Sequence, residues 1–158
     1  MARFDSTDAP RLVSEARRDA GLTQSELAQR SGVSQPNLSA IEAGRRAVAP
    51  DLLERILRAA DYRPGLAMRL HQADIEEAAR RVGVRAMRVF GSVARGRDHF
   101  TSDIDLVVDL EPGADLLRAM ALPVDVEAIT GFPAEMYLER SLAGSAEGAQ
   151  LLDGAVAL

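Results

Sequence analysis

Several residue types are absent or scarce in this sequence of 158 residues. It contains no cysteine, which excludes disulfides, thiolate zinc sites and thiol nucleophiles. Any metal ion must therefore be held by oxygen ligands or by His71 and His99. No apolar run is long enough to span a membrane, and the first 20 residues do not resemble a secretory signal. A cytoplasmic protein without a membrane partner is expected.

Lysine is also absent, so all 19 basic residues are arginine, and they are unevenly distributed. Residues 1–70 contain 11 arginines against 9 acidic residues, whereas residues 71–158 contain 8 against 15. Hydrophobic residues make up 47% of the chain, which is enough to form a buried core. The uneven charge suggests two halves with different partners.

The hydrophobic pattern changes near residue 70. Before it, apolar residues recur every three or four positions between short glycine-containing breaks, which predicts several short helices. After it, a helix over "ADIEEAARRVGV" is followed by three predicted strands, "RAMRVF", "DIDLVVDL" and "PVDVEAI", with further helices expected near 113–121, 133–142 and 145–153. We therefore predict a multidomain protein, an all-α bundle followed by an α+β domain with a small mixed sheet. The expected boundaries are 1–66 for the first domain, 67–72 for a linker or the start of a connecting helix, and 73–158 for the second domain.

A helix-turn-helix is predicted within the first half. Thr23 and Glu26 have the spacing of a capping box, so a helix begins there and ends at Gly32. Ser34 can cap a second helix that has Pro36 in its first turn. Two helices joined by a three-residue turn have helix-turn-helix spacing.

The stretch "GLTQSELAQRSGVSQPNLSAIEAGRR" resembles the Cro/repressor-type family in its Xre-like form. This resemblance implies that residues 35–43 enter the major groove of operator DNA, with Gln35 positioned to bind adenine. Pro36 and Ala40 replace polar readers common in the family, so base readout would be sparse and a homodimer would be needed. The alternative is a helical bundle that contacts protein. The expected DNA-binding residues are Gln24, Gln35, Asn37, Ser39, Arg45 and Arg46.

The second half contains two aspartates that would lie side by side. In a strand, Asp103 and Asp105 share one face, while Ile104 points to the other. Two such carboxylates repel each other unless a cation lies between them, and oxygen ligands favour Mg²⁺ or Mn²⁺. Upstream, Gly91 and Ser92 follow a predicted strand and could receive phosphate oxygens. The combination predicts a nucleoside triphosphate site.

The same residues resemble the minimal nucleotidyltransferase family of the polymerase-β superfamily. Its signature is Gly-Ser, ten residues, then Asp-x-Asp, as found here from Gly91 to Asp105. The resemblance implies transfer of a nucleoside monophosphate from ATP or another NTP to a hydroxyl, with two metal ions. It assigns catalysis and metal binding to Asp103, Asp105 and Asp125, with Glu127 as a weaker third candidate, and nucleotide binding to Gly91, Ser92 and Arg95.

Three functions remain open at this stage. The first is an antitoxin that represses its operon and adenylylates a tyrosine of a partner toxin of the HEPN ribonuclease type, as the resemblance implies, alone as a homodimer or in a toxin–antitoxin hetero-oligomer. The second is a transcriptional regulator whose nucleotidyltransferase domain only senses nucleotide or serves for docking. The third is a nucleotidyltransferase that acts on small molecules or tRNA.

Overall fold

The computed structural model describes residues 2–157, and its first half is entirely helical. No helix among the described residues is long and apolar enough to cross a membrane. The elements of this half are η1 (Ser6–Asp8), α1 (Ala9–Asp19), α2 (Gln24–Ser31), α3 (Gln35–Glu42), α4 (Pro50–Ala59) and α5 (Pro64–Leu70).

The predicted helix-turn-helix is confirmed as α2 and α3. Thr23 accepts a hydrogen bond from the backbone of Glu26, and the Glu26 carboxylate accepts one from the backbone of Thr23. Gly32 ends α2 in the left-handed region, at φ 68°, where glycine is favoured. Ser34 stands at the cap position of α3, although its side chain makes no capping hydrogen bond. Between the two helices and the rest of the small core, Leu27, Ala28, Leu38 and Ile41 are buried, and Val33 is partly buried.

The second half contains a mixed four-stranded sheet in the order β3-β2-β1-β4. β1 pairs antiparallel with β2 and with β4, whereas β2 and β3 are parallel. The elements are α6 (Gln72–Arg81), β1 (Val84–Phe90), α7 (Gly91–Ala94), β2 (Ile104–Leu110), α8 (Leu116–Ala119), α9 (Leu122–Thr130), β3 (Ala134–Leu138), α10 (Glu139–Leu142), α11 (Ala146–Asp153) and β4 (Val156–Ala157).

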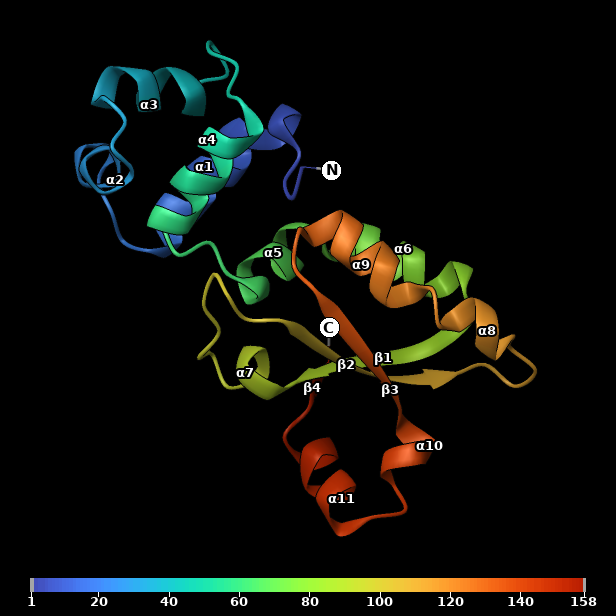
Figure 1. The fold of residues 1–158 in the computed structure, drawn as a ribbon. Helices are drawn as coiled ribbons and strands as arrows, with labels where there is room; N and C mark the ends of the chain where they lie inside the picture. The colour runs from blue at the N-terminus through green and yellow to red at the C-terminus, as the bar shows by residue number, and fades with distance from the viewer. Residues whose placement is uncertain (1, 158) are drawn as a thin grey trace.

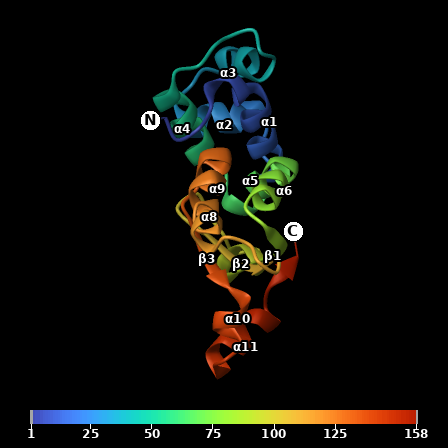
Figure 2. The ribbon, with the colours of Figure 1, turned by 90° about the vertical axis from the view of Figure 1, so that its right-hand side faces the viewer.

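Figure 1 shows how helices cover the two faces of the sheet: α6, α8 and α9 lie on the face toward the helix-turn-helix, and α10 and α11 lie on the other side. The view turned by 90° in Figure 2 shows the same arrangement, with the sheet between α8 and α9 on one side and α10 and α11 on the other. Side chains from Ile104, Leu106 and Val108 of β2 join the core between the sheet and the upper helices. The opposite face of β2 carries Asp105 and Asp109, with the buried Val107 between them.

Two sequence-based assignments are wrong. The segment predicted as the third strand is helix α9, because Leu122, Val126 and Ile129 recur at helical spacing and Gly131 ends the helix at φ 78°. The third long strand, β3, instead lies in the segment predicted to be helical near 133–142. Its residues alternate between partly buried and exposed, which is the period of a strand.

The segment expected as a linker or connecting helix is helical. Its residues 67–70 belong to α5, and Leu66, Ala67 and Met68 are buried in the core that both halves share. Helix α5 therefore connects the halves as a packed element.

The two halves are further joined by an aromatic cluster. Phe4 and Tyr62 from the helical half pack with Phe100 and Phe132, with neighbouring ring centroids 5.6 to 6.2 Å apart. The Arg3 guanidinium lies 4.4 Å from the Phe100 ring centroid. Such aromatic and cation–π contacts add to the energy of simple burial.

Polar contacts hold the loop between α7 and β2 to the helical half. The Asp98 side chain is fully buried and accepts hydrogen bonds from the Gly65 backbone at 2.6 Å and from Arg63 at 3.1 Å. The Asp61 carboxylate accepts a hydrogen bond from the Phe100 backbone at 2.8 Å and contacts the His99 ring nitrogen Nδ1 at 3.1 Å. This loop connects the Gly-Ser pair to the Asp-x-Asp, so the helical half positions it.

Candidate active site

The predicted aspartate pair lies where β2 begins. Asp103 is exposed and immediately precedes the strand, and Asp105 is its second residue and half-buried. Ile104 points to the opposite face and is fully buried in the core. Because side chains alternate along a strand, both carboxylates face away from α6 and α9, as predicted.

The third carboxylate on this face comes from Glu135. The register between the parallel strands places Glu135 beside Asp105, and the register of β1 places Phe90 on the other side of Asp105. Cross-strand partners in a sheet share a face, so these three side chains form one row. Glu135 is exposed, as a residue that meets a substrate needs to be.

Asp125 does not belong to this row, which corrects the assignment of the third carboxylate. It lies in the first turn of α9, a helix that packs Leu122 and Val126 into the core on the opposite face of the sheet. Glu127 lies on the same helix. The misplacement follows directly from the strand wrongly predicted over this segment.

Gly91 lies directly against Asp105, the second residue of the aspartate pair. It has φ 68°, and a Cβ atom at this position would overlap Oδ2 of Asp105 and lie 3.3 Å from its Cγ. Only glycine has both the required backbone freedom and the missing side chain. The Gly-Ser turn and Asp105 are thus packed directly together.

Asp105 lies near two other acidic side chains, and their charges affect its pKa. Burial raises the pKa of Asp105, and the negative charges of Asp103 and Glu135 raise it further, while Arg95 acts in the opposite direction. Arg95 is therefore near enough for its charge to act on Asp105. A cation placed among these oxygens would relieve the repulsion.

The donor chemistry of the pair fits a hard divalent cation. Carboxylate oxygens are the ligands that Mg²⁺ and Mn²⁺ prefer. Within residues 2–157, however, no three His, Asp or Glu side chains lie close enough together to hold a metal ion. The Glu135 carboxylate instead accepts a hydrogen bond from the Tyr137 hydroxyl, 2.8 Å from Oε2. The fitting donors are therefore Asp103 and Asp105.

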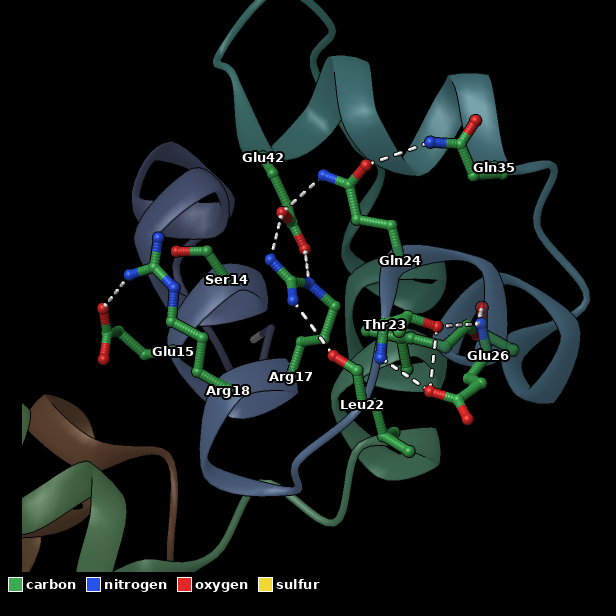
Figure 3. A network of polar contacts seen from close by, with 12 residues as sticks. Ser14, Glu15, Arg17, Arg18, Leu22, Thr23, Gln24, Glu26, Gln35 and Glu42 are labelled. Carbon is green, nitrogen blue, oxygen red and sulfur yellow. Dashed lines mark hydrogen bonds and ion pairs between the residues drawn. The ribbon is translucent and has the colours of Figure 1, made fainter.

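Figure 3 shows a hydrogen-bond chain in the helix-turn-helix that leads to Gln35. Arg17 donates two hydrogen bonds to Glu42, at 2.6 and 3.0 Å, and Gln24 donates to Glu42 at 2.8 Å. The Gln35 side-chain amide donates to Oε1 of Gln24 at 3.0 Å. Gln24 is thus oriented from the interior, and it orients the exposed Gln35 in turn.

The charge on Glu42 is stabilised by this chain. Burial favours the neutral form of Glu42, but the hydrogen bonds from Arg17 and Gln24 outweigh that effect, so its pKa is lowered. Of the other predicted DNA-binding residues, Arg45 and Arg46 are exposed, and Asn37 accepts a hydrogen bond from Arg46 at 3.2 Å. Ser39 is half-exposed on α3.

Comparisons with known proteins match both halves. Residues 13–66 match the family model described as helix-turn-helix, and residues 74–145 match the one described as nucleotidyltransferase domain. The chain is 37% identical over 72 residues to protein adenylyltransferase MntA of Thermococcus cleftensis, which covers 46% of this chain and 70% of that protein. The chain belongs to the minimal nucleotidyltransferase family.

Two further relatives agree with this assignment. A solved structure described as a minimal nucleotidyltransferase gives a TM-score of 0.52 at 33% identity, covering 60% of this chain and 95% of that chain. The helix-turn-helix part is 46% identical over 48 residues to an HTH-type transcriptional regulator of Methanothermobacter thermautotrophicus, which covers 30% of this chain and 70% of that protein. This minimal nucleotidyltransferase therefore carries an Xre-type DNA-binding domain at its N-terminal side.

Sequence reasoning missed the side chains that β3 and the end of β1 bring to the nucleotidyltransferase site. Glu135, Tyr137 and Phe90 share the face of Asp105, and the rings of Phe90 and Tyr137 stack edge to face with centroids 5.5 Å apart. The available signal was the alternation in "AEMYL", where glutamate and tyrosine alternate with apolar residues after Pro133.

Proposed function

We propose that this protein transfers AMP from ATP to a hydroxyl group, and that it acts as an antitoxin which also represses its own operon. One observation carries the proposal. Asp103, Asp105 and Glu135 lie near one another on one side of the sheet, and Asp105 lies directly against the Gly91 turn. This is a place where the anionic triphosphate and the cation that neutralises it can be held together.

Each residue of the candidate site would have a separate role in the transfer. Asp103 and Asp105 would hold the divalent cation, either Mg²⁺ or Mn²⁺. Ser92 and Arg95 would bind phosphate oxygens, because both follow Gly91 closely in the chain and the charge of Arg95 acts on Asp105. Glu135 would accept the proton of the attacking hydroxyl. When bound, the cation would stabilise the charge that develops on the entering and leaving oxygens.

The acceptor and the DNA come from outside the chain in this proposal. We propose a tyrosine of a HEPN-type toxin as the acceptor, as the resemblance to the minimal nucleotidyltransferase family implies. The relative named protein adenylyltransferase supports protein as the acceptor class. Operator binding through Gln35 and its neighbours would provide the repression, and the similarity to an HTH-type transcriptional regulator supports a regulatory role.

The test is label transfer from α-³²P-ATP to the toxin encoded beside this gene, with Mg²⁺ present. The variants are Glu135→Gln and Asp125→Asn, which each replace one carboxylate by the amide of the same shape; Glu135 is exposed and Asp125 is partly buried. We expect Glu135→Gln to lower the rate by at least about 100-fold, the usual contribution of a positioned base, and Asp125→Asn to leave it unchanged. Equal effects of the two changes would contradict the placement of Glu135. Full label transfer in both variants would contradict the proposed chemistry.

A second candidate is a regulator that binds nucleotide without transferring it. It is favoured by the engagement of Glu135 with Tyr137 and by the lack, within residues 2–157, of three metal-ligating side chains close together. Calorimetric binding of ATP without label transfer to any protein would support this candidate. Asp103→Ala should abolish binding in either case.

A further inference from the structure

Tyr137 has a position that neither the nucleotide nor the cation requires. It lies on β3 opposite Val107 of β2, on the same face as Asp105, and 38% of the residue is exposed. Its ring is held against Phe90, and its hydroxyl donates a hydrogen bond to Glu135 at 2.8 Å. A tyrosine hydroxyl is therefore already placed on the carboxylate that would receive an acceptor's proton.

The other tyrosine of the chain differs in every respect. Tyr62 is 1% exposed and belongs to the aromatic cluster between the two halves. Its hydroxyl is buried without a hydrogen-bond partner among the described residues. Tyr137 is therefore the one tyrosine of the sequence whose hydroxyl a nucleotide in this site could reach.

We infer that Tyr137 is a self-acceptor: without a partner, the protein adenylylates its own Tyr137. The inference rests on the proposed transferase function and deepens it, because it identifies an acceptor within the chain. The phenolic oxygen forms a bond to the α-phosphorus of ATP, and the bond from that phosphorus to the β-phosphate bridging oxygen breaks. The phenolic proton passes to Glu135, and pyrophosphate leaves.

The modification would occupy the place of an external hydroxyl. Glu135 can receive a proton from only one acceptor at a time, and its Oε2 is engaged by Tyr137. An AMP group on Tyr137 would also fill the open face beside Asp105. Self-modification therefore competes with transfer to a partner at the same carboxylate.

The experiment is to incubate the full chain with ATP and Mg²⁺, without any partner, and to measure its intact mass and its peptide map. We expect one added AMP group, located on Tyr137, at a rate constant that does not depend on protein concentration. Tyr137→Phe and Glu135→Gln should lose the adduct. Tyr62→Phe is the matched control and should keep it, because the Tyr62 hydroxyl has no hydrogen bond to lose.

A second readout does not depend on turnover. In the Tyr62→Phe variant, Tyr137 is the single remaining tyrosine and the sequence has no tryptophan, so tyrosine fluorescence reports on Tyr137 alone. Binding of a nonhydrolysable ATP analogue with Mg²⁺ should change this fluorescence. An unchanged signal at a nucleotide concentration shown by calorimetry to saturate the protein would overturn the placement.

The outcomes also separate this inference from the proposed function. N-acetyltyrosinamide, added at high concentration, serves as an external phenol acceptor for the unmodified full chain. Label on this acceptor but not on the protein overturns self-modification and leaves the transferase function standing. An adduct on a residue other than Tyr137, or one that persists in Tyr137→Phe, also overturns it. No label on either acceptor contradicts both proposals.

Discussion

Replacement of Gly91 by alanine tests whether the Gly-Ser turn and the aspartate pair act as one site. The added methyl group has two separable effects. It forces a residue with a side chain to adopt φ 68°, and it overlaps Oδ2 of Asp105. Gly96 provides the matched control, because it has φ 61° and nothing lies within 4 Å of a Cβ built there.

The backbone effect should be equal in the two variants. A left-handed conformation costs an alanine about 1–2 kcal/mol, and a chain of this length loses about 2–4 °C of Tm for each kcal/mol. Both variants should therefore melt roughly 2–8 °C below the unmodified protein. Only Gly91→Ala must also rotate the Asp105 carboxylate, and misplacement of a reacting group by about 1 Å can cost roughly 100-fold in rate.

The assay is differential scanning fluorimetry beside label transfer from α-³²P-ATP. Gly91→Ala should show both a lower Tm and a rate reduced by about 100-fold, whereas Gly96→Ala should show only the lower Tm. Wild-type activity in Gly91→Ala would refute the contact as a requirement of the site. An equal loss of activity in Gly96→Ala would assign the effect to the loop backbone instead.

Three further predictions concern the parts of the chain that hold the sites in place. Asp98→Ala should lower the free energy of unfolding by about 3 kcal/mol in urea denaturation, because it leaves the buried Gly65 amide unpaired; a loss below about 0.5 kcal/mol would contradict this role. The lowered pKa of Glu42 adds stability that is present above its usual value of 4.5 and is lost as pH falls through the lower pKa of the folded state. Glu42→Gln should therefore reduce the dependence of stability on pH on the acid side, measured by urea denaturation down to about pH 3. Gln35→Ala should weaken operator binding in mobility-shift assays by about 1–3 kcal/mol, and Gln24→Ala should do so by a smaller amount; equal binding to operator and random DNA in the unmodified protein would contradict base readout.

The sequence allowed much of the fold to be predicted, because local signals and tertiary packing agree there. The capping box and the left-handed Gly32 bound α2 through contacts within a few residues. Strand β1 contains two valines and strand β2 contains two valines and one isoleucine, and the strands are bounded by glycine or by charged residues. In these segments the sequence pattern therefore favours one type of secondary structure over the other.

The error at the third carboxylate has a physical origin. "PVDVEAI" alternates apolar and acidic residues as a strand does, yet Leu122, Val126 and Ile129 also fall on one helical face. Packing of that face onto the sheet decides between the two periods, and a linear sequence does not contain that packing. Once this segment becomes helix, β3 must come from residues 134–138, and Glu135 replaces Asp125 beside Asp105.

The anchoring of the loop before Asp103 by Asp61 and by Arg63 has a consequence for work on fragments. Cutting the chain near residue 70 would remove both anchors and uncover the rings of Phe100 and Phe132. The isolated second half would then expose aromatic side chains to solvent, and the loop before Asp103 would lack its hydrogen bonds to Asp61 and Arg63. Lower transferase activity of this fragment than of the full chain would reflect the loss of these contacts. The helix-turn-helix half would then support the fold of the nucleotidyltransferase half even where no DNA is bound.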